Sequence, residues 1–190
     1  LLSVLDMLCL VILIVIQTLA AMKMSVLNKL LEQRAYTDAH TGLPNKDACE
    51  VLLNNKETVA EHTACMMFDL NNLKIINDTK GHSKGDQLIL NFARLLRNVI
   101  PQKDFVGRYG GDEFMVVIYN TSKTEIEDIL KQLSREKDRL NSSGNNMPID
   151  YACGWAISDA DSECTIQMLL DKADYYMYEN KQAYKKSKKS

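Results

Sequence analysis

The sequence lacks paired cysteines and any strong excess of charge, and each lack excludes a class of protein. Its five cysteines are odd in number and widely scattered, with no C-x-x-C pair of the kind that zinc and redox sites use. We interpret them as reduced thiols of a cytosolic protein. The formal net charge of −2 leaves no basic excess, so nucleic acid is not an expected partner.

The chain of 190 residues is long enough for one ordinary domain with an appendage, but too short for two full domains. Its first part is a long apolar run. Residues 7–22 are apolar or small except for Gln17 and Thr18, and residues 1–5 extend the run. About 20 such residues cross the hydrocarbon layer of a bilayer. We therefore predict a transmembrane helix over residues 1–22 that anchors the protein to a membrane.

Two other interpretations of the apolar run are a cleaved signal peptide and a buried core helix. A signal peptide has a basic segment before its apolar run, and none is present here. A core helix of this length is rarely apolar around its whole circumference. We expect the last transmembrane helix of a longer receptor with an unknown sensor. Lys23, Lys29 and Arg34 follow the run, so the positive-inside rule puts the remainder in the cytoplasm, at the inner membrane.

Residues 23–36 mix polar and apolar positions and contain no Pro or Gly. Their apolar residues recur at helical spacing, which predicts a helical stalk. Two such stalks could pair as a short coiled coil, although this length allows two heptads at most. The globular domain is expected over residues 37–190. Its lysine-rich end is interpreted as a solvated helix end, with contact to a membrane surface as the alternative.

Helical and strand patterns alternate within the domain. Strands are predicted over residues 63–68, 105–109, 114–119 and 147–157, and helices over 85–100, 124–141 and 165–185 and after the cap Asn45. The two runs around Gly110 and Gly111 have the pattern of a hairpin. This order predicts an α+β domain with one mainly antiparallel sheet covered by helices.

Three acidic residues occupy positions where a charge is costly. Asp69 ends an apolar strand, while Asp112 and Glu113 lie at the tip of the hairpin. If the strands are neighbours, the three carboxylates converge at one edge of the sheet. Unpaired anions at close range repel one another, and oxygen ligands of this kind suit Mg²⁺ bound together with substrate phosphates. Gly110 and Gly111 allow a phosphate or sugar to approach the backbone closely.

A second polar cluster follows the first of these acids. Lys74 could neutralise phosphate oxygens, and Asn77 and Asp86 match the donor and acceptor edge of guanine. Each also has a purely structural interpretation. Asn77 suits a turn, Asp86 suits the first turn of a helix, and Gly85 is an ordinary chain breaker.

Together these residues resemble the GGDEF family of diguanylate cyclases, and the resemblance covers residues 38–185. Residues 108–114 are the family's R-Y-G-G-D-E-F. Residues 38–45 are similar to its D-x-L-T-G-L-x-N, and residues 69–86 to its D-x-D-x-F-K-x-I-N-D-x-x-G-H-x-x-G-D. The family's A-D-x-x-x-Y-x-x-K is matched by Ala173, Asp174, Tyr178 and Lys181. Five letters alone could match by chance, but four ordered motifs at family spacing could not.

The resemblance implies a palm-like sheet of the nucleotidyl cyclase or ferredoxin-like kind, covered by helices. It also implies a homodimer that condenses two GTP molecules into cyclic di-GMP and pyrophosphate. Each active site would hold two Mg²⁺ ions, with Mn²⁺ as an alternative, through Asp69, the carbonyl of Leu70, Asp112 and Glu113. The residues implied as catalytic are Asp112, Glu113 and Lys74. Those implied in substrate binding are Lys74, Asn77, Asp86, Asn72, Leu73, Gly110, Gly111, Lys181 and Lys185.

The sequence departs from the family pattern at several positions, none of them an implied metal ligand or guanine contact. Asn71 and Leu73 replace Asp and Phe, His40 replaces Leu, and Lys46 replaces Arg. Lys185 stands where an Arg is common, so it keeps the charge but loses the planar fork that holds phosphate in two bonds. Substrate affinity is expected to suffer.

The inhibitory site of many family members is an R-x-x-D motif shortly before GGDEF, which grips a cyclic di-GMP dimer. Here Pro101 stands at the Arg position, and only Asp104 remains. Proline has neither a charge nor a donor, so we predict weak or absent product inhibition and interpret Asp104 as a turn residue.

Two other functions compete with catalysis. The chain could be a catalytically inactive GGDEF domain that binds GTP or cyclic di-GMP as a signalling module, but intact Asp69, Asp112 and Glu113 argue against that. It could also be a structural dimerisation module built on the membrane helix and stalk. Nothing in the sequence excludes the second as an additional role.

Overall fold

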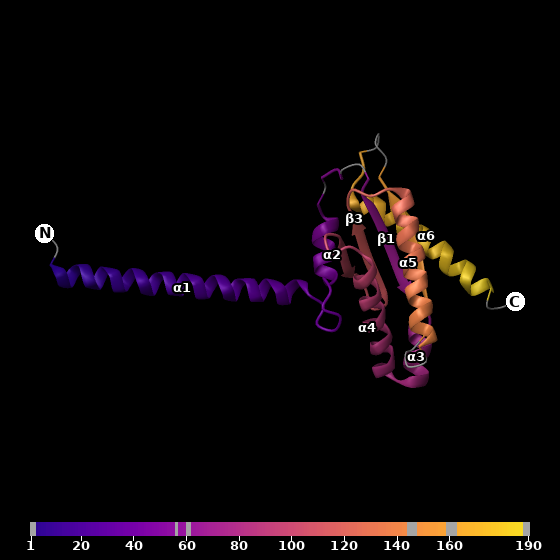
Figure 1. Ribbon diagram of the computed structural model, residues 1–190, viewed down its shortest axis with the longest axis horizontal. Coiled ribbons are helices and arrows are strands. Elements are labelled where there is room, and N and C mark those ends of the chain that lie inside the picture. Colours follow the sequence, from indigo (N-terminus) through magenta and orange to yellow (C-terminus); the bar gives the residue numbers. More distant parts are fainter. Residues whose placement is uncertain (1–2, 56, 60–61, 144–147, 159–162, 188–190) are drawn as a thin grey trace. The chain divides into compact units, whose positions relative to one another are not determined.

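The computed structural model describes residues 3–55, 57–59, 62–143, 148–158 and 163–187 (Figure 1). By its internal contacts the chain divides into two units, Leu1–Thr37 and Asp38–Ser190.

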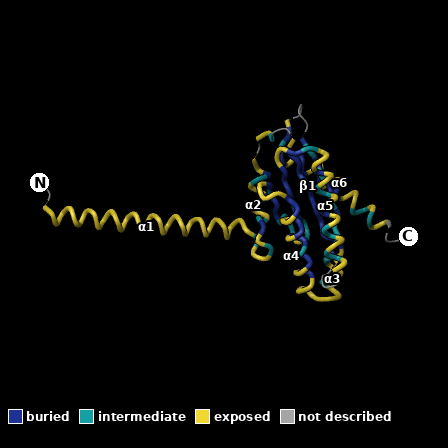
Figure 2. Tube along the Cα trace, viewed as in Figure 1, coloured by how far each residue is buried: buried dark blue, intermediate teal, exposed yellow. Residues whose placement is uncertain are grey.

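The first unit is one continuous helix, α1 (Val4–Tyr36), which joins the predicted membrane span and the predicted stalk. Ser3 caps it, because its side chain accepts a hydrogen bond from the backbone N–H of Asp6 and the Asp6 carboxylate accepts one in return. None of its described residues is buried, as Figure 2 shows. By length and composition alone, α1 is able to cross a bilayer.

The second unit is built on a sheet of four strands, in the order β2-β3-β1-β4, with every neighbouring pair antiparallel. The strands are β1 (Ala64–Leu70), β2 (Phe105–Arg108), β3 (Glu113–Ile118) and β4 (Tyr151–Ile157). The helices are α2 (Lys46–Leu53), α3 (Leu73–Lys80), α4 (His82–Val99), α5 (Lys123–Ser142) and α6 (Ile166–Ser187). From β1 to β4 this is the split β-α-β order of ferredoxin-like folds. The α+β class and the palm-like sheet predicted from the sequence are confirmed.

Different helices cover the two faces of the sheet, because side chains alternate along β1. Phe68 and Leu70 point to the face covered by α4 and α5. Cys65 and Met67 point to the opposite face, which α2 and α6 cover. Asp69 continues this second set, so the alternation turns its carboxylate toward α6.

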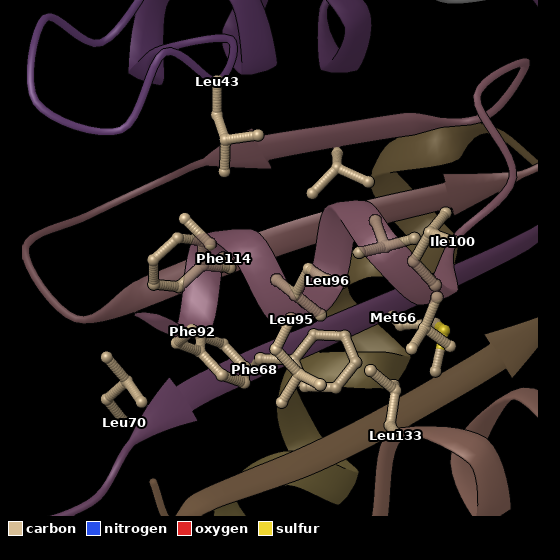
Figure 3. Close-up of a cluster of buried hydrophobic side chains, with 14 of the residues drawn as sticks. Leu43, Met66, Phe68, Leu70, Phe92, Leu95, Leu96, Ile100, Phe114 and Leu133 are labelled. Atoms are coloured by element: carbon tan, nitrogen blue, oxygen red, sulfur yellow. The ribbon is translucent and has the colours of Figure 1, made fainter. Parts of the chain in front are cut away.

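Aromatic rings fill the centre of the first cluster (Figure 3). The ring centroid of Phe92 on α4 lies 5.8 Å from that of Phe68 and 5.0 Å from that of Phe114, both edge to face. Burying one such side chain contributes about 1.5–3 kcal/mol. These contacts fix α4 across β1 and β3, next to the hairpin.

Gly154 allows α6 to lie directly on β4. A Cβ atom built at this position would meet only backbone: the carbonyl carbon of Tyr176 at 2.7 Å, with the Met177 nitrogen and the Ala173 oxygen closer still. No other residue fits under the helix without moving it. This close approach determines how far the rest of α6 lies from the end of β1.

The structure differs from the sequence prediction in the segment after β1. The alternative interpretation of Asn77 was a turn residue, but it lies in α3, which forms because Ile76 packs into the core. The chain break comes at Gly81, which has a φ of 84°. The interpretation of Gly85 as a breaker is wrong. It is buried inside α4, where a Cβ atom would collide with the Asn77 side chain.

Element limits also differ. β1 runs two residues beyond the predicted end at residue 68, which places Asp69 and Leu70 within the paired strand. The predicted start of the last strand, residue 147, lies outside the described residues, and β4 begins at Tyr151. The predicted cap Asn45 is confirmed, since its side chain accepts a hydrogen bond from the Ala48 N–H at 3.0 Å.

Candidate active site

Two of the three predicted acids lie opposite each other where β1 and β3 meet the hairpin. Asp69 pairs with Glu113 in the antiparallel register. Directly opposite residues have Cβ atoms about 4.5–5.5 Å apart, and like charges in such a pair are destabilising. Asp69 is only 5% exposed, so water screens little of this repulsion. The site is therefore arranged at a cost in stability.

Backbone hydrogen bonds hold the third acid beside this pair. The Leu70 N–H donates to the Asp112 carbonyl at 2.9 Å, and the Tyr109 and Gly110 N–H groups both donate to the Glu113 carbonyl, at 2.9 and 3.1 Å. The Glu113 carboxylate lies over Gly110, where a Cβ atom would be 2.5 Å from Oε2. Any side chain at position 110 would make the Glu113 carboxylate turn away from its present place.

Arg108 ties the loop before α2 to the hairpin. Its Nη1 lies 3.2 Å from both carboxylate oxygens of Asp38, and its Nη2 donates to the Gly111 carbonyl at 2.8 Å. Partial burial acts to raise the pKa of Asp38, but hydrogen bonds from Thr41 and the Arg108 charge outweigh it and hold that pKa below its usual range. Two family motifs distant in sequence are joined by this ion pair.

The hairpin acids are harder to ionise than ordinary carboxyl groups. Burial raises the pKa of Asp112, and the Asp69 charge raises it further. Burial, then Asp112, Asp69 and Asp174, raise the pKa of Glu113. In both cases the Lys181 ammonium partly offsets the shift. Asp174 had no role assigned from the sequence, although the family's A-D-x-x-x-Y-x-x-K pattern contains it.

The nearest cation to Asp69 is a lysine of the last helix. Lys181 Nζ donates to Asp69 Oδ2 at 2.6 Å. Asp69 Oδ1 is buried without a hydrogen-bond partner. Among the described residues, no three His, Cys, Asp or Glu side chains are gathered into a ready-made metal site. The donor set still fits Mg²⁺, because an unsatisfied buried carboxylate oxygen is the kind of group that a hard cation satisfies.

The second predicted cluster is assembled by the α3–α4 bend. Asn77 Oδ1 is buried without a hydrogen-bond partner and packs against Gly85, which precedes Asp86. The His40 ring lies over the same place, with Nε2 at 3.2 Å from the Asp86 carbonyl oxygen. The bend therefore packs Asn77 against the first turn of α4, which also carries Asp86, and leaves a buried amide oxygen without a partner in the chain.

The remaining predicted substrate contacts are spread around these two groups. Asn72 is exposed in a left-handed conformation, with a φ of 63°, and Leu73 begins α3. Lys74 is exposed on the same helix. Lys185 is exposed near the end of α6, about one turn beyond Lys181. Among the described residues, neither Lys74 nor Lys185 forms an ion pair with the acids.

Asp104 is more than a turn residue. It is 4% exposed, and its Oδ1 accepts a hydrogen bond from the Tyr119 N–H at 3.1 Å, which ties the start of β2 to the end of β3. Its own N–H donates to the Pro101 carbonyl at 3.0 Å, as in a turn. The carboxylate therefore has a structural function in addition to the expected turn.

The family comparison agrees with the motifs. The model described as "Diguanylate cyclase, GGDEF domain" matches residues 35–187. Signaling protein YkoW of Bacillus subtilis is 31% identical over 164 residues, 83% of this chain and 20% of YkoW. Diguanylate cyclase DgcP of Escherichia coli is 30% identical over 165 residues, 84% of this chain and 48% of DgcP. Cyclic di-GMP phosphodiesterase PdeB of Shewanella oneidensis is 32% identical over 146 residues, 76% of this chain and 17% of PdeB.

Solved structures agree on the fold. A microbial GGDEF domain with cyclic di-GMP is 27% identical, with a TM-score of 0.68, over 80% of this chain and 94% of that one. The coiled coil and GGDEF domain of DgcB from Caulobacter crescentus gives a TM-score of 0.77 over 92% of this chain and 95% of that one, at 23% identity. The chain spans less than half the length of the three relatives named above. On the matched family model, the chain belongs to the GGDEF family of diguanylate cyclase domains.

Proposed function

We propose that the chain is a membrane-anchored diguanylate cyclase that condenses two GTP molecules into cyclic di-GMP and pyrophosphate at a homodimer interface. The observation that carries this proposal is the register pair Asp69 and Glu113, with Asp112 hydrogen-bonded alongside. A fold that only had to be stable would not retain mutually repelling, half-buried carboxylates at one point. Their presence is explained if divalent cations and nucleotide phosphates bind there.

The proposed reaction consists of two nucleotidyl transfers. Each 3′-hydroxyl oxygen attacks the α-phosphorus of the GTP on the facing protomer, and the bond to the leaving pyrophosphate breaks. The hydroxyl proton passes to Glu113 or Asp112, which would act as the general base. Mg²⁺, when bound through Asp69, the Leu70 carbonyl, Asp112 and Glu113, would supply charge neutralisation. Lys74, Lys181 and Lys185 would bind phosphates.

Guanine selection is assigned to Asn77 and Asp86, with Asn72 and Leu73 beside them and Gly110 and Gly111 giving the nucleotide access to the backbone. Asn77 Oδ1 supports this assignment, since it is buried and has no partner in the chain. Adenine presents a different donor pattern, so it would leave buried polar groups unpaired.

Membrane anchoring and dimerisation are assigned to α1, with the catalytic domain in the cytoplasm. The length and apolar composition of α1 support the first assignment, and its exposed apolar residues in the stalk support the second. Dimerisation is tested by replacing residues 1–22 with a leucine zipper. The rate per monomer at low concentration should rise, because two GTP-loaded faces must meet. An unchanged rate would show that the stalk is only a tether.

The catalytic assignment is tested by pyrophosphate release from GTP with Mg²⁺. Glu113→Gln should lose activity, whereas Glu127→Gln, which removes an exposed acid on α5, should not. Release that is equal in all three proteins would overturn the assignment. Absence of release from the unmodified chain, together with retained GTP or cyclic di-GMP binding, would favour the inactive signalling module.

A further inference from the structure

Lys181 forms an ion pair with a carboxylate that the proposed function assigns to a metal. Its Nζ lies 2.6 Å from Asp69 Oδ2. The two residues are 112 positions apart, so only the docking of α6 on the sheet brings them together. Asp69 is 5% exposed, and a buried carboxylate of this kind is costly without a cation. The ammonium therefore provides in the chain itself what a metal would provide.

The Lys181 charge acts on the whole group of acids. Asp69 pairs with Glu113 in the register of β1 and β3, and the Leu70 N–H bond to the Asp112 carbonyl holds the third acid alongside, so all three face the same lysine. One flexible cation thus moderates the repulsion among the three carboxylates that would bind Mg²⁺. A divalent cation on Asp69 Oδ1 would lie close to the ammonium on Oδ2, so the two cations repel each other and compete for the charge of one carboxylate.

Lys181 lies beyond the buried part of α6, so it can separate from Asp69 while the helix stays folded on the sheet. The buried residues of α6 on the sheet include Leu170, Ala173 and Met177, and Lys181 follows the last of these by one turn. Its ammonium is carried on a flexible four-carbon stem and its side chain is 27% exposed. Release of Asp69 therefore removes the contact of the last turns of α6 with β1 and leaves the buried contacts of the helix intact.

We propose that Lys181 is an internal counter-cation, which holds Asp69 in the metal-free chain and must be displaced before a divalent cation binds. This inference rests on the proposed function of the site. A metal that arrives alone leaves the ammonium without its partner. A metal that arrives with GTP offers it phosphate oxygens instead, so metal and nucleotide bind with positive coupling. Lys181 thereby favours loading of the metal together with substrate.

The test is Mn²⁺ binding to the full chain in detergent without nucleotide, followed by the electron paramagnetic resonance signal of free Mn²⁺. Lys181→Gln should bind Mn²⁺ more tightly than the unmodified chain, by about tenfold, within the usual range of coupling between sites. Lys172→Gln removes the same charge from an exposed position on the same helix and should change little. Equal affinity of the unmodified chain and Lys181→Gln would overturn the inference.

A failure of the proposed metal site would look different. In that case Mn²⁺ would bind to neither protein, or Glu113→Gln would leave its affinity unchanged. A salt bridge that serves only to stabilise the fold predicts a lower melting temperature for Lys181→Gln with no gain in Mn²⁺ affinity, and this outcome also overturns the inference.

A second measurement uses the unmodified chain and does not depend on the variant folding. Saturating Mg²⁺ without nucleotide should speed amide hydrogen exchange in the last turns of α6, residues 181–187, because displacement of Lys181 removes their tie to β1. Unchanged exchange under saturating Mg²⁺ would overturn the displacement.

Discussion

The contact between α6 and β4 gives the sharpest prediction for stability. Gly154→Ala adds a Cβ atom whose three nearest neighbours are backbone atoms at 2.7 Å or less, whereas ordinary contact begins at 3.4 Å. Backbone of a packed helix cannot turn aside as a flexible side chain can. The helix must move away from the sheet, and its buried residues Leu169 and Leu170 move with it.

Overpacking of a well-packed core costs about 1–3 kcal/mol, and the backbone nature of all three contacts places this change at the upper end. We expect a loss of about 3 kcal/mol in the free energy of unfolding, or a melting temperature lower by about 6–12 °C. Urea unfolding can be followed by the fluorescence of Trp155, the single tryptophan, which neighbours the substitution.

Gly111→Ala is the matched control, because a Cβ atom there meets nothing within 4 Å and Gly111 is not among the positive-φ glycines of the described chain. Its effect on unfolding should stay within about 0.5 kcal/mol. A cost below about 1 kcal/mol for Gly154→Ala would refute the reasoning, since α6 could not then lie against β4 as described.

Three further predictions concern the site. Asp112→Asn should lower cyclase activity about 100-fold or more and yet raise the melting temperature of the metal-free chain near neutral pH. Burial and a neighbouring carboxylate raise the pKa of Asp112 in the folded chain. The carboxyl group therefore stabilises the fold fully below the unfolded value of 3.8, and this contribution is lost as the pH rises through the folded value. The gain in melting temperature from Asp112→Asn should accordingly vanish in melts near the unfolded value. The unmodified chain should bind GTP well above ATP, and Asn77→Ala with Asp86→Ala should remove that preference; a preference that survives would contradict the guanine assignment. Cyclic di-GMP should inhibit weakly, and titration of Pro101→Arg should show stronger inhibition; strong inhibition of the unmodified chain, abolished by Asp104→Ala, would show a working inhibitory site.

Much of the fold was predictable because its signals are local. The apolar run of β1 and the two strands around the Gly-Gly turn have the right period, and Ser122 with Glu125 forms the capping box that begins α5. α3 was missed because Asn77, Asp78 and Gly81 are typical of turns. Tertiary packing of Ile76 outweighed those local preferences.

The residues of the candidate site could be predicted from the sequence, but the ion pair that Asp69 forms without metal could not. Motif spacing selected Asp69, Asp112 and Glu113, and the antiparallel register brings them together. The ion pair of Asp69 with Lys181 depends on how far α6 lies from β1. That distance is determined by Gly154 and by the buried face of the helix, and no local pattern encodes it.

The central claim is that these carboxylates serve the condensation of GTP. It is tested most directly by incubating the purified chain with GTP and Mg²⁺, and separating the products by chromatography. Cyclic di-GMP should form from the unmodified chain, with two pyrophosphates for each product molecule, and Asp112→Asn should form it at a rate lower by about 100-fold or more. Absence of cyclic di-GMP from a folded chain that binds both GTP and Mg²⁺ would contradict the account.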